Sequence, residues 1–246
     1  MSIPHSFHLV ALLASSIFIA TSGDARAADF GAGPPLAAPK ARGPSKLPPP
    51  TQDPDLKRAY AAYQRDDPAT AYASYLRAAR RGQAIGQYNV AVMAFNGEGT
   101  KRDVGAAKAW LTRAATQGFA LAQYNLGLLY ETGNGIERSQ KDASGWFLRA
   151  AEQGNVDAQL AVGTQYLLGR GIEKSDAHAA QWYERAAEGG NMDAQYNIAS
   201  FYEHGEGVRR DRERALRWYA EAGKQGDRAA IEKLRVLSQA APTTRQ

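Results

Sequence analysis

A single spacing recurs along most of this 246-residue chain and constrains its fold more than any other feature. All the tryptophans lie 36 residues apart, at Trp110, Trp146, Trp182 and Trp218. Glycines at positions 97, 133, 169 and 205 follow the same step, and so do glycines two residues after each of them. Because different residue types keep one register, we expect an array of structural repeats in which each unit packs against the next.

Each 36-residue unit has the pattern of two helices. In residues 120–155, Ala122, Leu126 and Tyr130 recur every four residues, which is typical of one helical stripe. Gly133 is placed to end this first helix, because glycine adopts the left-handed backbone conformation at little cost. The segment Gly133–Ile136 is therefore a loop and not a phosphate cradle. The second helix starts in every copy at a good N-cap residue, namely Asp67, Asp103, Ser139, Ser175 and Asp211.

The spacing, the Gly-x-Gly loop and the paired alanines resemble the Sel1-like repeat, a relative of the tetratricopeptide repeat. The matching strings are AQYNLGLLYETGNGIERSQKDASGWFLRAAEQG and AQYNIASFYEHGEGVRRDRERALRWYAEAGKQG. The resemblance implies an all-α fold, a right-handed α-solenoid of antiparallel helix pairs. It divides the centre of the chain into four repeats, which are residues 84–119, 120–155, 156–191 and 192–227.

Three glycines depart from the repeat pattern. Gly86 replaces an alanine of the first helix, Gly163 falls inside the first helix of the third repeat, and Gly223 replaces the second alanine of the last pair. Since glycine is a poor helix former, we expect each to loosen the packing by up to about 1 kcal/mol.

The segments on either side of the repeats have the character of caps. Residues 55–83 form a degenerate N-terminal helical pair without the Gly-x-Gly loop. Residues 228–242 begin with the amphipathic string RAAIEKLRVLS and are predicted to form a C-terminal capping helix.

The N-terminal residues 1–27 have the pattern of a secretory signal peptide. Leu9–Ala20 is a 12-residue apolar run, which is too short for a membrane-spanning helix, and the small residues Ala25 and Ala27 mark a cleavage site. We therefore expect a periplasmic or secreted protein of a bacterium that keeps no membrane span after cleavage following Ala27. An uncleaved, weakly anchored N-terminus is the alternative.

Residues 28–54 are rich in proline, alanine and glycine and cannot bury enough apolar surface to offset their ordering entropy. We interpret them as a disordered linker, with a proline-motif ligand as the alternative.

No catalytic, cofactor or metal site is predicted. The chain has no cysteine, which excludes disulfides, thiolate metal sites and catalytic thiols. After cleavage only His178 and His204 remain, and the repeat pattern places both towards solvent. HExxH, P-loop and nucleophile-elbow motifs are absent. The net charge of +5 is spread over a mixed surface without interleaved aromatic residues, so no nucleic-acid partner is expected.

The first helix of each repeat has a second face, opposite Leu126 in the second repeat. In the parent repeat class this helix lines the concave side, so an apolar face there suits a helix or extended peptide of a protein partner. The alternative is that these residues pack against the neighbouring repeat. The predicted groove residues are Tyr88, Val92, Phe95, Leu121, Tyr124, Leu128, Leu160, Leu167 and Tyr196.

A row of arginines on the second helix gives the rival hypothesis. Arg77, Arg113, Arg149 and Arg185 follow the 36-residue step and form either a solvated face or a stripe that binds anionic cell-envelope polymer.

The resemblance implies a non-enzymatic interaction scaffold or regulator. Similar exported members of the family restrain membrane sensor kinases, organise envelope assemblies or contact host proteins, so a periplasmic sensor domain or an envelope assembly component is the kind of partner expected. Some cysteine-rich members have been described as β-lactam-binding or hydrolysing proteins. The paired cysteines that define them are missing here, so a β-lactam or cell-wall hydrolase is the least favoured alternative.

Sequencing of the N-terminus tests the export hypothesis. When the chain is expressed and the exported fraction is collected, the first residues should read from near Ala28 onward, because the small-residue site ends at Ala27. A start at Met1, or recovery only inside the cell, would contradict it.

Overall fold

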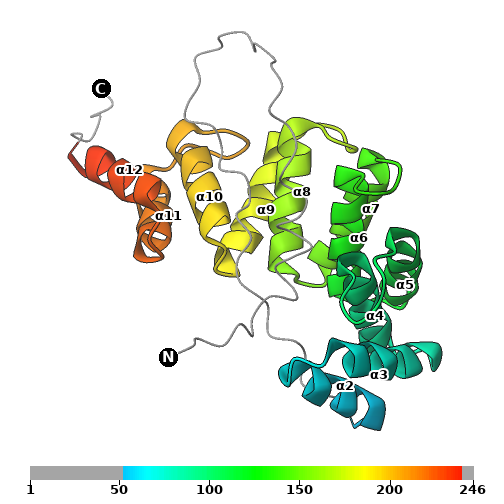
Figure 1. Cartoon of the computed structure of the whole chain (residues 1–246). Helices are drawn as coiled ribbons and strands as arrows, with labels where there is room; N and C mark the ends of the chain where they lie inside the picture. Colours follow the sequence, from blue (N-terminus) through cyan, green and yellow to red (C-terminus); the bar gives the residue numbers. More distant parts are fainter. Residues whose placement is uncertain (1–51, 240–246) are drawn as a thin grey trace, which may run out of the picture. The chain divides into compact units, whose positions relative to one another are not determined.

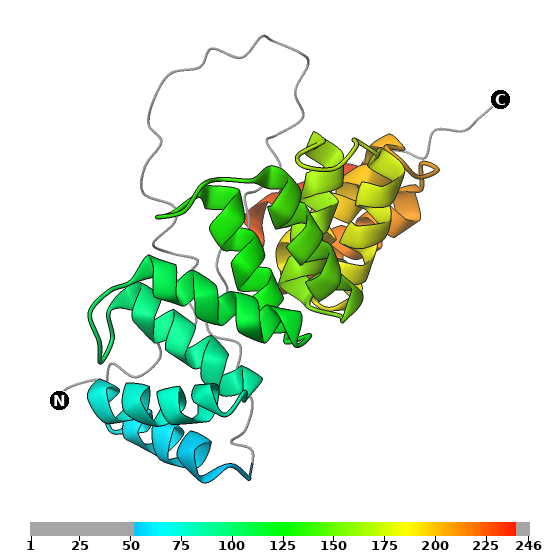
Figure 2. The same ribbon diagram turned by 90° about the vertical axis from the view of Figure 1, so that its right-hand side faces the viewer.

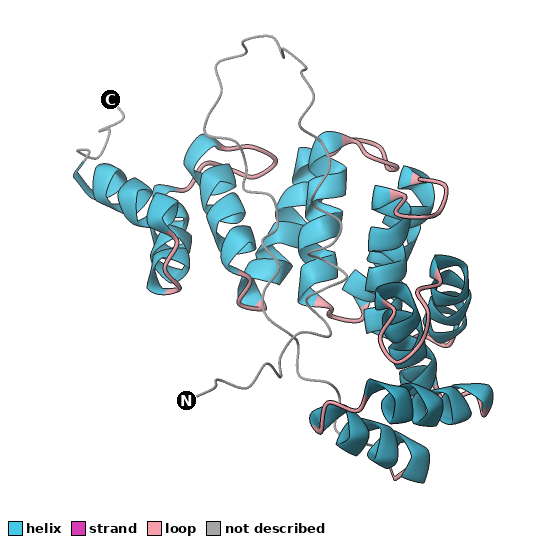
Figure 3. Cartoon of the chain, viewed as in Figure 1, coloured by secondary structure: helices cyan, strands magenta, loops and turns pink. Residues whose placement is uncertain are grey.

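The computed structural model describes residues 52–239, and within them helices joined by loops are the only regular secondary structure (Figures 1 and 3). The all-α architecture of helix pairs predicted from the sequence is confirmed. The helices are α2 (Pro54–Gln64), α3 (Pro68–Arg80), α4 (Ala84–Asn96), α5 (Val104–Thr116), α6 (Ala120–Thr132), α7 (Gln140–Glu152), α8 (Val156–Leu168), α9 (Asp176–Glu188), α10 (Met192–His204), α11 (Arg212–Lys224) and α12 (Arg228–Gln239).

The predicted signal peptide, residues 1–27, and nearly all of the predicted linker, residues 28–54, lie outside the described residues. The first described helix begins at Pro54, which is the last residue of the predicted linker. Its N-cap is Asp53, whose side chain accepts hydrogen bonds from the backbone N–H groups of Asp55 and Leu56. Helices α2 and α3 occupy the stretch predicted as a helical pair, and α12 the stretch predicted as a capping helix.

The described chain divides into two compact units, residues 52–150 and 151–239, with the boundary near the end of α7. In the first unit each of the helices α2, α3, α4 and α5 packs on the next one along the chain (Figure 2). The second unit shows the same order from α8 to α12. Contacts between consecutive helices are the packing rule of a solenoid.

The boundaries of the helices are set by local chemistry. The first helix of each repeat, here called helix A (α4, α6, α8 and α10), ends at a left-handed glycine with φ between 65° and 79°. The second helix, helix B, starts at the predicted cap in every copy. These five caps accept a hydrogen bond from a backbone N–H three residues later, and they are Asp67, Asp103, Ser139, Ser175 and Asp211.

The second glycine of the loop lies against the first turn of the preceding helix B at Gly99, Gly135 and Gly207. Gly207 has φ +64°, and a Cβ added there would lie 2.2 Å from the carbonyl oxygen of Asp176, in the first turn of α9. Gly99 has φ +66° and approaches the carbonyl oxygen of Pro68 in the same way, at 2.0 Å. Both the backbone conformation and the close approach therefore require glycine.

A buried glutamine fastens helix A to the preceding helix B. The side-chain amides of Gln123 and Gln195 donate to the carbonyl oxygens of Ala115 and Ala187, at 3.0 and 3.2 Å. These carbonyls lie at the end of the preceding helix B, where helical partners run out. Gln225 in turn donates to the Oε1 atom of Gln195 at 2.7 Å, so the buried amide is paired on both sides.

The glycines expected to loosen the packing have a different role. A Cβ on Gly163 would lie 2.6 Å from the ring of Tyr183, so this glycine makes room for an aromatic residue of helix B. Gly86 lets α4 approach α3 closely, because a Cβ there would be 2.7 Å from the backbone nitrogen of Ala79. The tight fit at these two sites is the physical reason that the expectation of loose packing does not hold.

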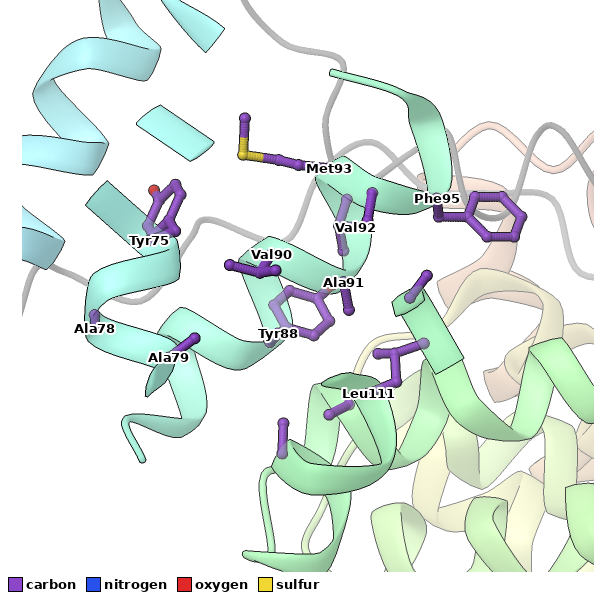
Figure 4. Close-up of a cluster of buried hydrophobic side chains, with 14 of the residues drawn as sticks. Tyr75, Ala78, Ala79, Tyr88, Val90, Ala91, Val92, Met93, Phe95 and Leu111 are labelled. Atoms are coloured by element: carbon purple, nitrogen blue, oxygen red, sulfur yellow. The ribbon is translucent and has the colours of Figure 1, made fainter. Parts of the chain in front are cut away.

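The core follows the chain as a continuous layer within each unit. In the first unit, buried residues of α3, α4 and α5 meet around α4, which is buried along most of its length. Figure 4 shows Tyr75 of α3, Val90 and Met93 of α4, and Leu111 of α5 in this cluster. The second unit has an equivalent cluster that includes Tyr183, Phe201 and Tyr219.

Replacing Gly207 by alanine should destabilise the protein far more than replacing Gly226. Both glycines have positive φ, so both substitutions carry a conformational cost of about 1–2 kcal/mol. Only Gly207 also meets backbone atoms, whereas a Cβ on Gly226 has no neighbour within 4 Å. The clash should add about 1–3 kcal/mol to the loss of unfolding free energy measured by urea denaturation. Equal losses in the two variants would contradict the packing of the loop.

Candidate functional site

The predicted groove residues lie on helices A, but their burial differs from helix to helix. On α4, Tyr88, Val92 and Phe95 are 2% exposed or less. On α8 and α10, Leu160 and Tyr196 are buried, while Leu167 is partly exposed. The structure thus separates a buried subset from residues that keep a surface.

Tyr88 packs between repeats in the first unit. Its ring meets the ring of Phe119 edge-on, with 5.4 Å between centroids, and its hydroxyl accepts a hydrogen bond from the side-chain amide of Asn125 at 3.2 Å. Burial raises the pKa of the Tyr88 hydroxyl well above its usual value. At Tyr88 the structure therefore agrees with the alternative interpretation of the sequence, in which such residues pack against the neighbouring repeat.

Helix α6 carries the predicted residues that remain accessible. Leu121, Tyr124 and Leu128 are all partly exposed, and their spacing of three and four residues places them on one side of the helix. The ring of Tyr124 packs against the ring of Phe147, with 5.8 Å between the ring centroids. These three side chains are called the α6 face below.

In the second unit the corresponding face is acidic at both ends. Asp157, in the first turn of α8, accepts a hydrogen bond from the side chain of Asn191, the N-cap of α10, at 3.4 Å. The ring of Tyr196 lies 5.3 Å from that of Tyr219. Burial raises the pKa of the Tyr196 hydroxyl, and the nearby charges of Asp227 and Glu203 raise it further.

Glu203 joins three helices of the second unit. Its carboxylate accepts a hydrogen bond from the hydroxyl of Tyr219 in α11 at 2.7 Å. The same carboxylate forms an ion pair with the ammonium group of Lys233 in α12 at 3.0 Å. Burial alone raises the pKa of this carboxyl, but the hydrogen bonds from Tyr219 and Lys233 and the charges of Lys233 and His204 outweigh it. The pKa of Glu203 is therefore held below its usual value.

The arginine row is engaged by neighbouring side chains. Arg113, Arg149 and Arg185 each place the guanidinium carbon 4.5 Å from the ring centre of the tryptophan three residues earlier. Arg77 instead pairs with Asp55 at 2.8 Å. Glu221 follows Trp218 at this position and pairs with Lys224.

The sequence pattern of the arginines did not predict that they stack on the tryptophans, although the sequence contains the spacing that produces this contact. A tryptophan followed by an arginine three residues later recurs with the period of the repeat, and residues three apart share a helix face. The regular spacing of these arginines therefore follows partly from their packing over the rings of the tryptophans.

The two histidines of the described residues lie on different helices, α9 and α10, and have separate partners. His178 is exposed, stacks on Tyr166 at 4.9 Å and contacts the hydroxyl of Ser175. The ring of His204 lies 2.9 Å from the carbonyl oxygen of Ser200. Among residues 52–239, no group of three His, Cys, Asp or Glu side chains is arranged to hold a metal ion. No helix in the same range has the length and apolar character needed to cross a membrane.

Replacing Glu203 by glutamine tests the acidic junction of α10, α11 and α12. A carboxylate with a lowered folded pKa stabilises the protein above its unfolded pKa, and this contribution is lost as the pH falls through the folded value. The substitution should cost about 1–3 kcal/mol at pH 7, the worth of hydrogen bonds to a charged group. The gap between the variants should narrow as the pH falls below the usual carboxyl range of about 4, because the Glu203 carboxylate then takes up a proton. Urea denaturation from pH 7 into this acidic range measures it, and a gap that stays constant over the whole range would contradict the assignment.

Comparison with known proteins agrees with the repeat seen in the structure. The family model described as Sel1 repeat matches residues 84–119, 120–155, 156–191 and 193–227, the first of which spans α4 and α5. A Sel1 repeat protein from Oxalobacter formigenes is 32% identical, with a TM-score of 0.69, and the match covers 74% of this chain and 73% of that one. A search of the curated proteins gives no match.

A second solved structure shows the same fold. It is a protective antigen present in uropathogenic Escherichia coli strains and displays an SLR fold, with 33% identity and a TM-score of 0.70. The match covers 74% of this chain but only 39% of the antigen, so the chain spans less than half of that protein. The repeat model covers more than half of the chain, and the resemblance found in the sequence is confirmed. The chain belongs to the Sel1 repeat family.

Proposed function

We propose that this protein is a non-enzymatic scaffold or regulator that holds a peptide or helix of a protein partner against the α6 face. Sel1 repeat proteins are generally protein-interaction modules. The observation that carries the proposal is that Leu121, Tyr124 and Leu128 stay partly exposed. By contrast Tyr88 and Val92, the α4 equivalents of Tyr124 and Leu128, are buried. An apolar stripe with an aromatic centre, on a rigid helix, is suited to anchor a partner.

The burial pattern narrows the surface proposed from the sequence. Tyr88, Val92 and Phe95 belong to the core of the first unit and are not offered to a partner. The binding surface is accordingly centred on the second repeat and not spread over the first three. Tyr124 is its natural anchor, because it is the aromatic residue at the centre of the partly exposed α6 face and its ring is supported by Phe147.

The proposal places the protein in the periplasm or outside the cell, with a sensor domain or an envelope assembly component as its partner. The N-terminal signal pattern supports this location, and the fit to an interaction module supports the kind of partner. No catalytic role is included. His178 contacts the hydroxyl of Ser175, the N-cap of its own helix, and the ring of His204 contacts the carbonyl oxygen of Ser200 one turn earlier, so both histidines take part in local contacts of their own helices.

Tyr124→Asp should abolish binding through the α6 face while leaving the fold intact. A photo-reactive residue at position 128 in cells identifies the partner, and titration calorimetry with the purified partner measures the affinity. Loss of an aromatic anchor of at least about 2 kcal/mol corresponds to a weakening of at least about 30-fold. The expected circular dichroism and melting temperature are close to those of the parent chain, because Tyr124 is not fully buried.

Tyr130→Asp is the matched control, since Tyr130 lies on the same helix, is also partly exposed and contacts Lys108 instead. It should leave the affinity within about twofold. Unfolding of the Tyr124→Asp variant would support a core role for this residue. Binding that ignores Tyr124→Asp but falls steeply between low and moderate salt would favour the arginine row and an anionic polymer.

A further inference from the structure

The loop of the first repeat lies over the short turn between α2 and α3. A Cβ on Gly99 would be 2.0 Å from the carbonyl oxygen of Pro68, the first residue of α3, so the loop is held against this turn. The turn is closed by the backbone N–H of Asp66, which donates to the carbonyl oxygen of Tyr63 at 3.0 Å. Glu98, the residue before Gly99, is therefore placed beside the end of α2.

Glu98 is a half-buried carboxylate that no cation neutralises. Its Oε1 atom accepts a hydrogen bond from the side-chain amide of Asn96 at 3.0 Å, and among residues 52–239 no lysine or arginine forms an ion pair with it. Arg102 of the same loop is engaged elsewhere, because its guanidinium donates to the carbonyl oxygen of Phe95 at 3.1 Å and lies over the ring of Phe95. The Glu98 carboxylate is thus available to the cation of a ligand.

This carboxylate lowers the stability of the fold. Burial raises the pKa of Glu98, although the hydrogen bond from Asn96 acts in the opposite direction. Because the folded chain then holds the proton more tightly than the unfolded chain, stability falls as the pH rises from the unfolded to the folded pKa. At neutral pH the ionised Glu98 therefore destabilises the protein, and no charge within the fold compensates it. A destabilising charge without an internal partner is typical of a residue that serves a ligand.

An aromatic ring lies beside the carboxylate. Tyr63 packs against the core of the first unit and keeps part of its surface exposed. Burial raises the pKa of the Tyr63 hydroxyl, and the negative charge of Glu98 raises it further. Tyr60, three residues earlier, is also partly exposed and lies on the same side of α2. A carboxylate next to an aromatic ring matches a guanidinium group, which is planar, donates hydrogen bonds in pairs and stacks on ring faces.

We propose that Glu98, Asn96 and Tyr63 form a subsite for an arginine side chain of a protein partner, in which the guanidinium pairs with the Glu98 carboxylate and packs against the ring of Tyr63. Asn96 holds the carboxylate in place. A lysine ammonium group would match the charge but not the planar geometry. The subsite goes beyond the proposed function, because it uses none of the residues of the α6 face and stands whether or not that face binds a partner.

The probe that tests the subsite is N-acetylarginine amide, an isolated arginine side chain without charged termini. In two-dimensional NMR spectra of the isotope-labelled chain, amide signals of residues 62–66 and 96–99 should shift with a saturable dependence on its concentration. N-acetylcitrulline amide has nearly the same shape but no charge. At equal ionic strength it should shift these signals at least about fivefold less, because charge-assisted hydrogen bonds are about twice as strong as neutral ones.

Glu98→Gln should abolish the shifts, and Glu206→Gln, at the same loop position of the fourth repeat but exposed, should leave them unchanged. Urea denaturation gives a readout without any ligand. At pH 7 the Glu98→Gln variant should unfold at a higher urea concentration than the parent chain, and the difference should shrink as the pH falls and the parent Glu98 takes up a proton. Because this variant is expected to be the more stable one, unfolding does not explain its loss of binding.

Equal shifts with the arginine and citrulline probes, equal shifts with N-acetyllysine amide, or shifts that survive Glu98→Gln would overturn the proposal. A Glu98→Gln variant that is less stable than the parent chain at pH 7 would show that the carboxylate serves the fold, and would overturn it as well. Tyr124→Asp should leave the probe shifts unchanged. Failure of the α6 face and failure of the arginine subsite are therefore seen in separate measurements.

Discussion

The repeat fold depends on one close contact, the passage of the Gly-x-Gly loop over the first turn of the preceding helix B. At Gly207 the loop backbone lies so near the carbonyl of Asp176 that no Cβ fits, and Gly99 meets Pro68 in the same way. The loop thereby sets the distance between successive repeats. The buried glutamine then ties helix A to the preceding helix B, because its amide donates to a carbonyl oxygen in the last turn of helix B. Both contacts use backbone atoms, which explains why they recur while side chains around them vary.

This arrangement leaves the function to the residues that the contacts do not use. Within helix A, the positions facing helix B and the loop are fixed by packing, while the remaining side varies from repeat to repeat. It is buried in α4 and apolar and partly exposed in α6, whereas in α8 and α10 it combines the buried residues Leu160 and Tyr196 with carboxylates. A repeat protein can therefore change its ligand without changing its fold, since the constant part is carried by glycine, glutamine and alanine.

Much of the fold could be predicted because its signals are local. The caps at Asp103 and Asp211 and the glycine ends of helices A depend on hydrogen bonds within a few residues, and the structure shows them where the sequence indicated. The role of Gly163 could not be read from propensity, because it depends on the ring of Tyr183 across the helix pair. Helix propensity describes an isolated helix, whereas this site is decided by what the neighbouring helix brings to it.

The candidate site was predicted only in outline for the same reason. Tyr88 and Tyr124 occupy equivalent positions, but Tyr88 has Phe119 and Asn125 as partners. One period later Phe119 is replaced by Asn155, which has no aromatic ring, and Asn125 is replaced by Ala161, which has no side-chain amide. The two tyrosines alone therefore look the same in the sequence. A buried tyrosine is distinguished from a partly exposed one only when the residues at the positions of its packing partners are also compared between repeats.

The central claim is that a protein partner binds the helix A side at α6. Hydroxyl-radical footprinting of the chain, alone and with its partner, tests it most directly because it reports side-chain accessibility residue by residue. The account predicts protection of Leu121, Tyr124 and Leu128, with Trp146 and Arg149 on helix B unchanged. Protection of the Trp146–Arg149 stack with continued oxidation of Tyr124 would contradict it.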